Sequence, residues 1–119
     1  DVYGHIDYVV RYGPNQNREY SYSRYQDILD EILRTVISKD CGIELNTGGF
    51  HYGLGEPNPC RAVLKRYHQL GGEIITIGAD AHTPDKVAYA FDKAYNILKD
   101  CGFRYYTTFK DRKPEFIKL

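Results

Sequence analysis

The sequence predicts an α/β fold in which parallel strands are covered by helices. Amphipathic helical segments alternate with short strand-like runs, beginning and ending with a strand. Alternation of this kind is typical of parallel sheets. Gly42, Gly72 and Gly102 also recur at intervals of 30 residues, which is roughly the length of one strand–helix unit.

The first three elements follow from apolar periodicity. We expect a strand within residues 2–8, where the chain is short and mostly apolar. Apolar side chains from Tyr25 to Ile37 recur every three or four positions and form one stripe, which predicts a helix. The run at residues 43–46 then predicts the second strand.

The remaining elements are recognised from their end signals. We interpret Asn58-Pro59 as a cap followed by proline at the first helical position, with the helix ending at Gly71. A strand follows at residues 74–77. Thr83-Pro84 predicts a third helix in the same way, ending at Gly102. A last strand is expected at residues 104–108, followed by a polar turn and a short apolar tail.

Size and composition limit the class of protein. A chain of 119 residues suits one domain with a modest core but is short for a complete barrel of roughly 200–250 residues. The 16 basic and 16 acidic side chains balance, which argues against nucleic acid bound through its phosphates but not against a small phosphorylated substrate. The chain has no apolar run of membrane-spanning length and no CxxC among its three cysteines, so we expect a cytoplasmic protein with reduced thiols and no membrane partner.

Three residues are candidate metal ligands. In parallel βα folds reactive groups gather where strands end, and Asp80 and His82 follow the strand predicted at residues 74–77. In extended chain, positions two apart project from the same side, and a carboxylate with an imidazole suits a divalent ion. His5 is the third candidate, with Asp7 as a partner that orients it. The alternative for each is ordinary hydrogen bonding.

Glu44 and Asn46 are candidate residues of a site floor. Alternation along their strand sends Ile43 and Leu45 to one face and Glu44 and Asn46 to the other. If helices cover the apolar face, the two polar side chains point inward, where a carboxylate needs a cation, a metal or hydrogen bonds. The alternative is a strand at a solvated edge.

Two further features have weaker signals. Arg11 could bind a phosphate through two parallel hydrogen bonds, although many arginines in such positions form surface salt bridges. The glycine-rich segment 47–59 lacks a nucleotide-binding pattern, so we interpret it as a long surface loop.

Taken together, these segments resemble the C-terminal part of histidinol-phosphate phosphatases of the polymerase-and-histidinol-phosphatase (PHP) family. Each motif is short, but the motifs keep the family's order and span nearly the whole chain. The matching stretches are Tyr3-Gly4-His5-Ile6-Asp7-Tyr8, Ile43-Glu44-Leu45-Asn46-Thr47, Gly78-Ala79-Asp80-Ala81-His82 and the strand region 102–108.

The resemblance implies a distorted (β/α)7 barrel, TIM-like in form, of which residues 1–119 would be the second half. It also implies up to three divalent ions, zinc, manganese or iron, at the C-terminal ends of the strands. His5, Asp80 and His82 match metal ligands of the family. Arg11 is the counterpart of an arginine that contacts substrate phosphate in some members. The substrate site would also include Glu44 and Asn46.

The implied activity is hydrolysis of L-histidinol phosphate to L-histidinol and phosphate in histidine biosynthesis, with a metal-activated water as the nucleophile. The family's N-terminal HxH motif has no counterpart in residues 1–119. We therefore expect this piece alone to be inactive, and to associate with another copy or with the missing N-terminal half. The alternatives are a PHP-type phosphodiesterase or exonuclease, and a non-catalytic assembly fragment.

Overall fold

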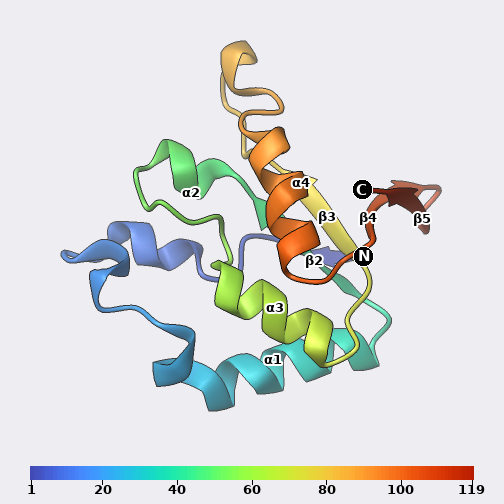
Figure 1. Cartoon of the computed structure of the whole chain (residues 1–119), viewed down its shortest axis with the longest axis horizontal. Helices are drawn as coiled ribbons and strands as arrows, with labels where there is room; N and C mark the ends of the chain where they lie inside the picture. The colour runs from blue at the N-terminus through green and yellow to red at the C-terminus, as the bar shows by residue number, and fades with distance from the viewer.

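A computed structural model describes residues 1–119 as a parallel sheet with helices packed beside it and a separate hairpin at the C-terminus (Figure 1). Helix α3 lies between α1 and α4 (Figure 1). In chain order the elements are β1 Val2–Tyr3, η1 Tyr8–Tyr12, η2 Gln16–Arg18, η3 Tyr22–Tyr25, α1 Gln26–Ser38, β2 Gly42–Asn46, α2 Gly48–His51, α3 Arg61–Gln69, β3 Ile75–Gly78, η4 Pro84–Lys86, α4 Phe91–Asp100, β4 Tyr105–Lys110 and β5 Lys113–Lys118, where η marks a 3-10 helix.

The sheet has the order β1-β2-β3 and is parallel throughout, as the alternation predicts. The prediction is wrong for the last strand, because β4 pairs antiparallel with β5 of the tail. Asp111 and Arg112 both have positive φ, 51° and 62°, which is the backbone of a tight hairpin turn. The Thr107 Oγ1 accepts the Ile75 N–H at 3.2 Å, so a side chain of β4 contacts β3 where a parallel ladder was expected.

The core forms where the helices meet the sheet. Leu29, Leu33 and Val36 of the predicted α1 stripe are buried, and Ile43 and Leu45 of β2 are fully buried. The Glu44 and Asn46 side chains lie outside this core and hydrogen-bond to one another, which confirms the alternation predicted for β2.

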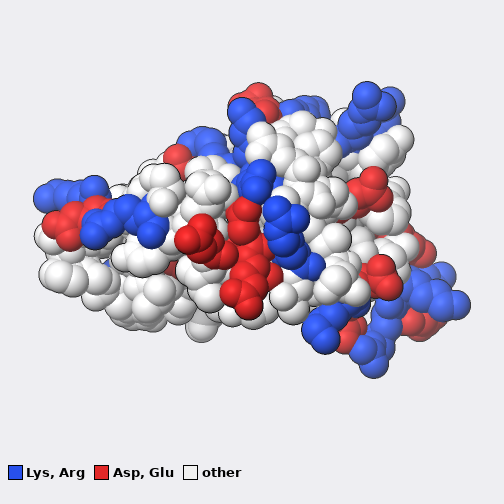
Figure 2. Space-filling model, turned by 90° about the horizontal axis from the view of Figure 1, so that it is seen from below, with Lys and Arg blue, Asp and Glu red and all other residues white.

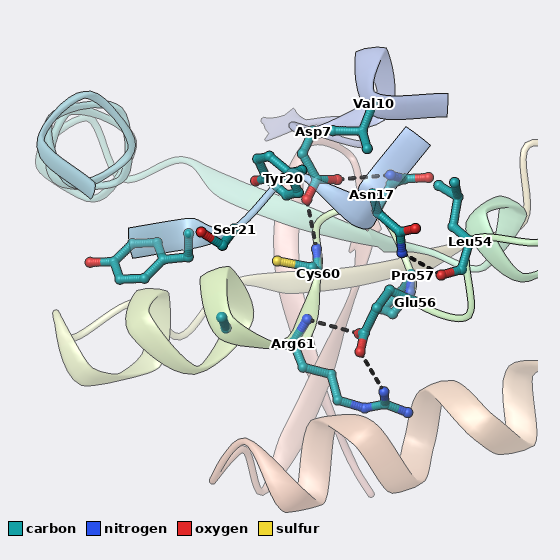
Figure 3. A pocket seen from close by; sticks show the side chains of 13 residues that line it. Asp7, Val10, Asn17, Tyr20, Ser21, Leu54, Glu56, Pro57, Cys60 and Arg61 are labelled. Atoms are coloured by element: carbon teal, nitrogen blue, oxygen red, sulfur yellow. Dashed lines mark hydrogen bonds and ion pairs between the residues drawn. The ribbon is translucent and has the colours of Figure 1, made fainter. Parts of the chain in front are cut away.

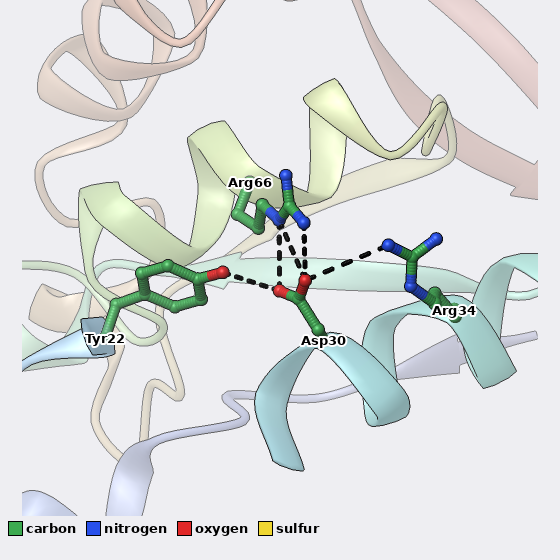
Figure 4. Close-up of polar contacts among 4 residues, drawn as sticks. All are labelled: Tyr22, Asp30, Arg34 and Arg66. Atoms are coloured by element: carbon green, nitrogen blue, oxygen red, sulfur yellow. Dashed lines mark hydrogen bonds and ion pairs between the residues drawn. The ribbon is translucent and has the colours of Figure 1, made fainter. Parts of the chain in front are cut away.

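A polar cluster joins α1 to α3 (Figure 4). Arg66 donates to both carboxylate oxygens of Asp30, from Nε at 3.0 and 3.1 Å and from Nη2 at 2.5 Å. The Tyr22 hydroxyl donates to the same carboxylate at 2.6 Å. These hydrogen bonds, with Arg66 the largest cause, lower the pKa of Asp30 to about 2. The cluster fixes how the two helices lie against one another.

Two predicted helix starts are wrong. Asn58 is not a cap: its backbone forms an antiparallel bridge with Asn46, with N···O distances of 2.8 and 2.9 Å. The Asn58 side-chain amide donates to Asp7 instead of facing the helix, and α3 begins at Arg61. Thr83-Pro84 starts a single 3-10 turn, and α4 begins later because Ala88 and Ala90 have left-handed backbone, with φ of 57° and 56°.

The first strand is shorter than predicted and the chain turns at His5, whose φ is 30°. The face that carries α1 has acidic and basic side chains intermingled, without a continuous basic surface (Figure 2). No helix in the structure combines the length and the apolar character needed to cross a membrane.

Candidate functional site

The C-terminal ends of β1, β2 and β3 lie at one edge of the sheet and bring several candidate residues together. His5 follows β1, and its backbone N–H donates to Glu44 Oε2 at 3.3 Å. The same oxygen accepts the Asn46 side-chain amide at 3.1 Å. Asn46 is paired across β2 and β3 with Gly78, two residues before Asp80.

Glycines make room for the Glu44 carboxylate. A Cβ at Gly78 would lie 2.1 Å from Glu44 Oε1, and one at Gly4 would lie 3.5 Å from Oε2. Any larger residue at position 78 would have to displace the carboxylate. Glu44 is half-buried, and its hydrogen bonds to neutral groups replace the cation that a buried carboxylate would otherwise need.

Asp80 and His82 lie close together, but not in the extended conformation that we predicted. Asp80 has a left-handed φ of 49°. The His82 Nδ1 lies 2.7 Å from the Asp80 carbonyl oxygen. A carbonyl oxygen can only accept, so Nδ1 carries the hydrogen and Nε2 of the neutral ring keeps its lone pair. Metal-binding histidines commonly have this arrangement, because a bond from one nitrogen fixes the tautomer that leaves the other free to ligate.

A small cavity of about 140 Å³ adjoins these two residues. It is lined by Gly48, His51, Tyr52, Ala79, Asp80, His82, Thr83, Lys86 and Tyr89. His51 and Tyr52 come from a segment to which the sequence assigned only a loop. Their positions depend on contacts distant in sequence, such as the His51–Tyr89 ring pair at 5.8 Å.

The segment predicted as a surface loop, 47–59, is buried at its start. The Thr47 N–H donates to the Gly78 carbonyl at 2.8 Å, and its hydroxyl donates to the Tyr89 carbonyl at 2.6 Å. A Cβ at Gly49 would lie 2.2 Å from the Glu56 carbonyl oxygen. Backbone segments come into close contact at Thr47-Gly48-Gly49, which explains the small side chains at these positions. This run joins the end of β2 to the segment that contains Asp80.

Arg11 lies in η1, with its guanidinium carbon 4.0 Å from the centre of the Tyr52 ring. Since Tyr52 also lines the cavity beside Asp80 and His82, the structure brings Arg11 to the same side of the molecule as these candidates.

Asp7 does not orient His5, contrary to the prediction. It is buried in a second cavity of about 260 Å³ (Figure 3). There its carboxylate accepts the Asn58 side-chain amide and the Cys60 N–H, both at 2.8 Å. Burial raises the pKa of Asp7, and it raises the pKa of the Cys60 thiol to about 11. Because the chain turns at His5, Asp7 is directed toward the loop before α3.

The donor types fit a divalent metal, but the chain does not assemble a full ligand set by itself. His5 and His82 offer imidazole nitrogens and Asp80 a carboxylate, which together suit zinc or a similar ion. No three histidine, cysteine, aspartate or glutamate side chains in the structure come together as a group able to hold a metal. These residues can therefore supply only part of the coordination sphere in the conformation described.

Comparison with known proteins connects this geometry with one group of enzymes. No protein-family model matches the chain. The chain is 35% identical over 111 residues to the histidinol-phosphatase of Lactococcus lactis subsp. lactis, covering 93% of this chain and 41% of that protein. It is 33% identical over 107 residues to a probable histidinol-phosphatase of Clostridium acetobutylicum, covering 87% of this chain and 40% of that protein.

A solved structure agrees with the sequence comparison. The crystal structure of histidinol phosphate phosphatase from Lactococcus lactis subsp. lactis, complexed with zinc, L-histidinol and phosphate, matches with a TM-score of 0.82 and 34% identity. The match covers 97% of this chain and 43% of that one. The chain thus spans about 40% of the length of the curated relatives it matches.

Proposed function

We propose that this chain, a relative of the histidinol-phosphatases in sequence and fold, forms part of a metal-dependent phosphomonoester hydrolase. Its substrate is L-histidinol phosphate, and the products are L-histidinol and phosphate. The observation that carries the proposal is the placement of His5, Glu44, Asp80 and His82 after or within adjoining parallel strands. The matching crystal structure, which holds zinc, L-histidinol and phosphate, supports this choice of substrate.

In this proposal the chain is the second half of a distorted (β/α)7 barrel in a cytoplasmic enzyme of histidine biosynthesis. His82 through Nε2, Asp80 through its carboxylate and His5 through its imidazole would hold divalent metal. Zinc is supported by the related structure, and manganese or iron suit the same donors. A bound ion would supply a water of lowered pKa and would neutralise charge on the phosphoryl group.

The other candidate residues position the reacting groups. Glu44 holds the backbone of His5 by accepting its N–H, and Asn46 in turn donates to Glu44. Glu44 and Asn46 therefore fix the backbone of His5, and with it the point from which the imidazole projects. Arg11 would donate charge-assisted hydrogen bonds to the substrate phosphate.

A chimera tests the activity. We would replace the matching segment of the Lactococcus lactis enzyme by this chain and measure phosphate release from L-histidinol phosphate. We expect zinc-dependent hydrolysis, reduced about 100-fold or more by His82→Ala or Asp80→Asn because each removes a metal ligand. Asp92→Asn, an exposed carboxylate on α4, is the matched control and should leave hydrolysis unchanged.

Two results would refute the proposal. Faster cleavage of an oligonucleotide than of histidinol phosphate would indicate a phosphodiesterase or exonuclease. A folded chimera that binds zinc at the level of the parent enzyme but releases no phosphate from either substrate would indicate a non-catalytic assembly role.

A further inference from the structure

We propose that Tyr8 and Tyr52 are positioning residues that clamp the Arg11 guanidinium so that it meets an anion held beside Asp80 and His82. This inference rests on the proposed function, because it assigns the anion as the phosphate of the substrate. It adds two aromatic residues, one of them 41 positions from Arg11 along the chain.

The guanidinium lies between aromatic rings. Its central carbon is 3.9 Å from the centre of the Tyr8 ring and 4.0 Å from that of the Tyr52 ring. A third ring, that of Tyr12, lies at 4.7 Å. A guanidinium at these distances is attracted by the negative faces of the rings, and stacking restricts its orientation.

The hydrogen bonds of Arg11 involve one of its three nitrogen atoms. Its Nη2 donates to the hydroxyls of Tyr8 and Tyr12, while Nη1 is buried without a hydrogen-bond partner. A buried donor without an acceptor is costly, and a phosphate oxygen would relieve this. Because the tyrosine hydroxyls hold Nη2, Nη1 and Nε are the donors left for an anion, and the rings around Nη1 must shift before an anion can reach it.

Arg11 also differs from the arginines that serve structural ion pairs. Arg34 and Arg66 pair with Asp30, Arg61 with Glu56, and Arg112 with Asp1. Arg11 has no carboxylate within ion-pair distance. The surface salt-bridge alternative for Arg11 is therefore wrong, and no carboxylate of the chain neutralises its charge.

Each ring of the clamp also lies near a candidate metal ligand. The Tyr8 ring lies 4.5 Å from the His5 ring, centre to centre, and Tyr52 lines the cavity that contains Asp80 and His82. The clamp therefore sets the position of Arg11 relative to candidate ligands on two different strands. An arginine and a metal ion that bind the same phosphate must be held at a fixed distance from each other.

Arginine modification measures the clamp directly. The 119-residue chain would be treated with phenylglyoxal, and modification at each arginine followed by peptide mass spectrometry with and without inorganic phosphate. We expect Arg11 to react about tenfold more slowly than the exposed Arg104, because two ring faces cover it. Tyr52→Leu should raise the Arg11 rate to near that of Arg104, whereas Tyr52→Phe, which keeps the ring, should preserve the protection.

The outcomes separate the clamp from the proposed function. Equal reactivity of Arg11 and Arg104 in the unchanged chain, or an unaltered Arg11 rate in Tyr52→Leu, would overturn the clamp. In the zinc-loaded chimera, inorganic phosphate should slow modification at Arg11 more than at Arg104, and this difference should vanish in Tyr52→Leu. An intact clamp that phosphate does not protect would overturn the anion role of Arg11 while leaving the aromatic contacts in place.

Discussion

Two of the candidate ligands have a backbone conformation that side-chain-bearing residues rarely adopt. His5 and Asp80 have φ of 30° and 49°, and each stands just after a strand of the parallel sheet. The left-handed region costs a residue with a Cβ about 1–2 kcal/mol, and such residues concentrate at functional sites. The two turns cost free energy, but they place both candidate side chains at the same edge of the sheet.

This argument predicts separate effects on stability and on metal binding. His5→Gly and Asp80→Gly should change the free energy of unfolding by less than about 1 kcal/mol, because relief of strain offsets the greater freedom of the unfolded chain. Each should weaken zinc binding about tenfold or more, since a ligand is lost. Urea denaturation of the chain measures the first quantity, and equilibrium dialysis of the chimera with zinc measures the second.

Asp40→Gly is the matched control for these variants. Asp40 has a φ of 51° but lies just after α1, outside the candidate site, so its replacement should relieve strain without altering zinc binding. If His5→Gly were to cost more than about 2 kcal/mol with zinc binding unchanged, the histidine would be structural.

For single residues, the sequence predicted side-chain positions that depend on alternation along one strand. It did not predict contacts between residues that are distant in the chain. Glu44 and Asn46 were placed on the correct face because Ile43 and Leu45 mark the opposite one. The partner of Asp7 is Asn58, 51 positions away, and no local pattern indicates that pair. The stacking of Arg11 on Tyr52 is invisible in the sequence for the same reason.

Among the elements, α1 was the easiest to predict because apolar positions recur along one stripe; Leu29, Leu33 and Val36 of this stripe are buried, whereas Tyr25 and Ile28 at its start are exposed. The start of α4 was predicted too early, since Pro84 signals a helical turn but cannot show that Ala88 and Ala90 interrupt it. Apolar periodicity predicts which face of a helix is buried but not how two helices are placed relative to each other, and polar contacts between them determine this. The Asp30–Arg66 pair is the example here, because it joins helices whose stripes alone do not set their relative position.

The pair between α1 and α3 predicts a pH-dependent stability. Because the pKa of Asp30 is lowered to about 2 in the folded chain from near 3.9 when unfolded, its contribution is full above the unfolded value and is lost as the pH falls toward about 2. Asp30→Asn should therefore lower the free energy of unfolding by about 1–3 kcal/mol at neutral pH. The difference from the unchanged chain should shrink between pH ~4 and ~2. Urea denaturation across this range measures it.

Glu31→Gln, at an exposed position of the same helix, should stay within about 0.5 kcal/mol of the unchanged chain at every pH. A constant difference for Asp30→Asn down to the lowest pH would show that the carboxylate charge does not contribute, and that packing alone joins the helices.

For the whole molecule, the sheet is open at β1, which has β2 as its single neighbour. A groove of about 510 Å³ lies next to this edge, between η1 and α1, and includes Tyr3, Val9 and Ile28. These three side chains are 51%, 73% and 54% exposed. An unpaired strand edge beside exposed apolar side chains favours association.

We therefore expect the 119-residue chain to associate in solution through this groove, and Val9→Glu to weaken the association about tenfold or more by placing a charge in an apolar contact. Sedimentation velocity over a series of protein concentrations measures the effect. Val87→Glu is the control, because Val87 is 69% exposed but belongs to the segment before α4, away from the groove. Equal weakening by both variants would indicate non-specific association of exposed apolar side chains. A monomer at all concentrations would show that the groove does not bind a second copy of the chain.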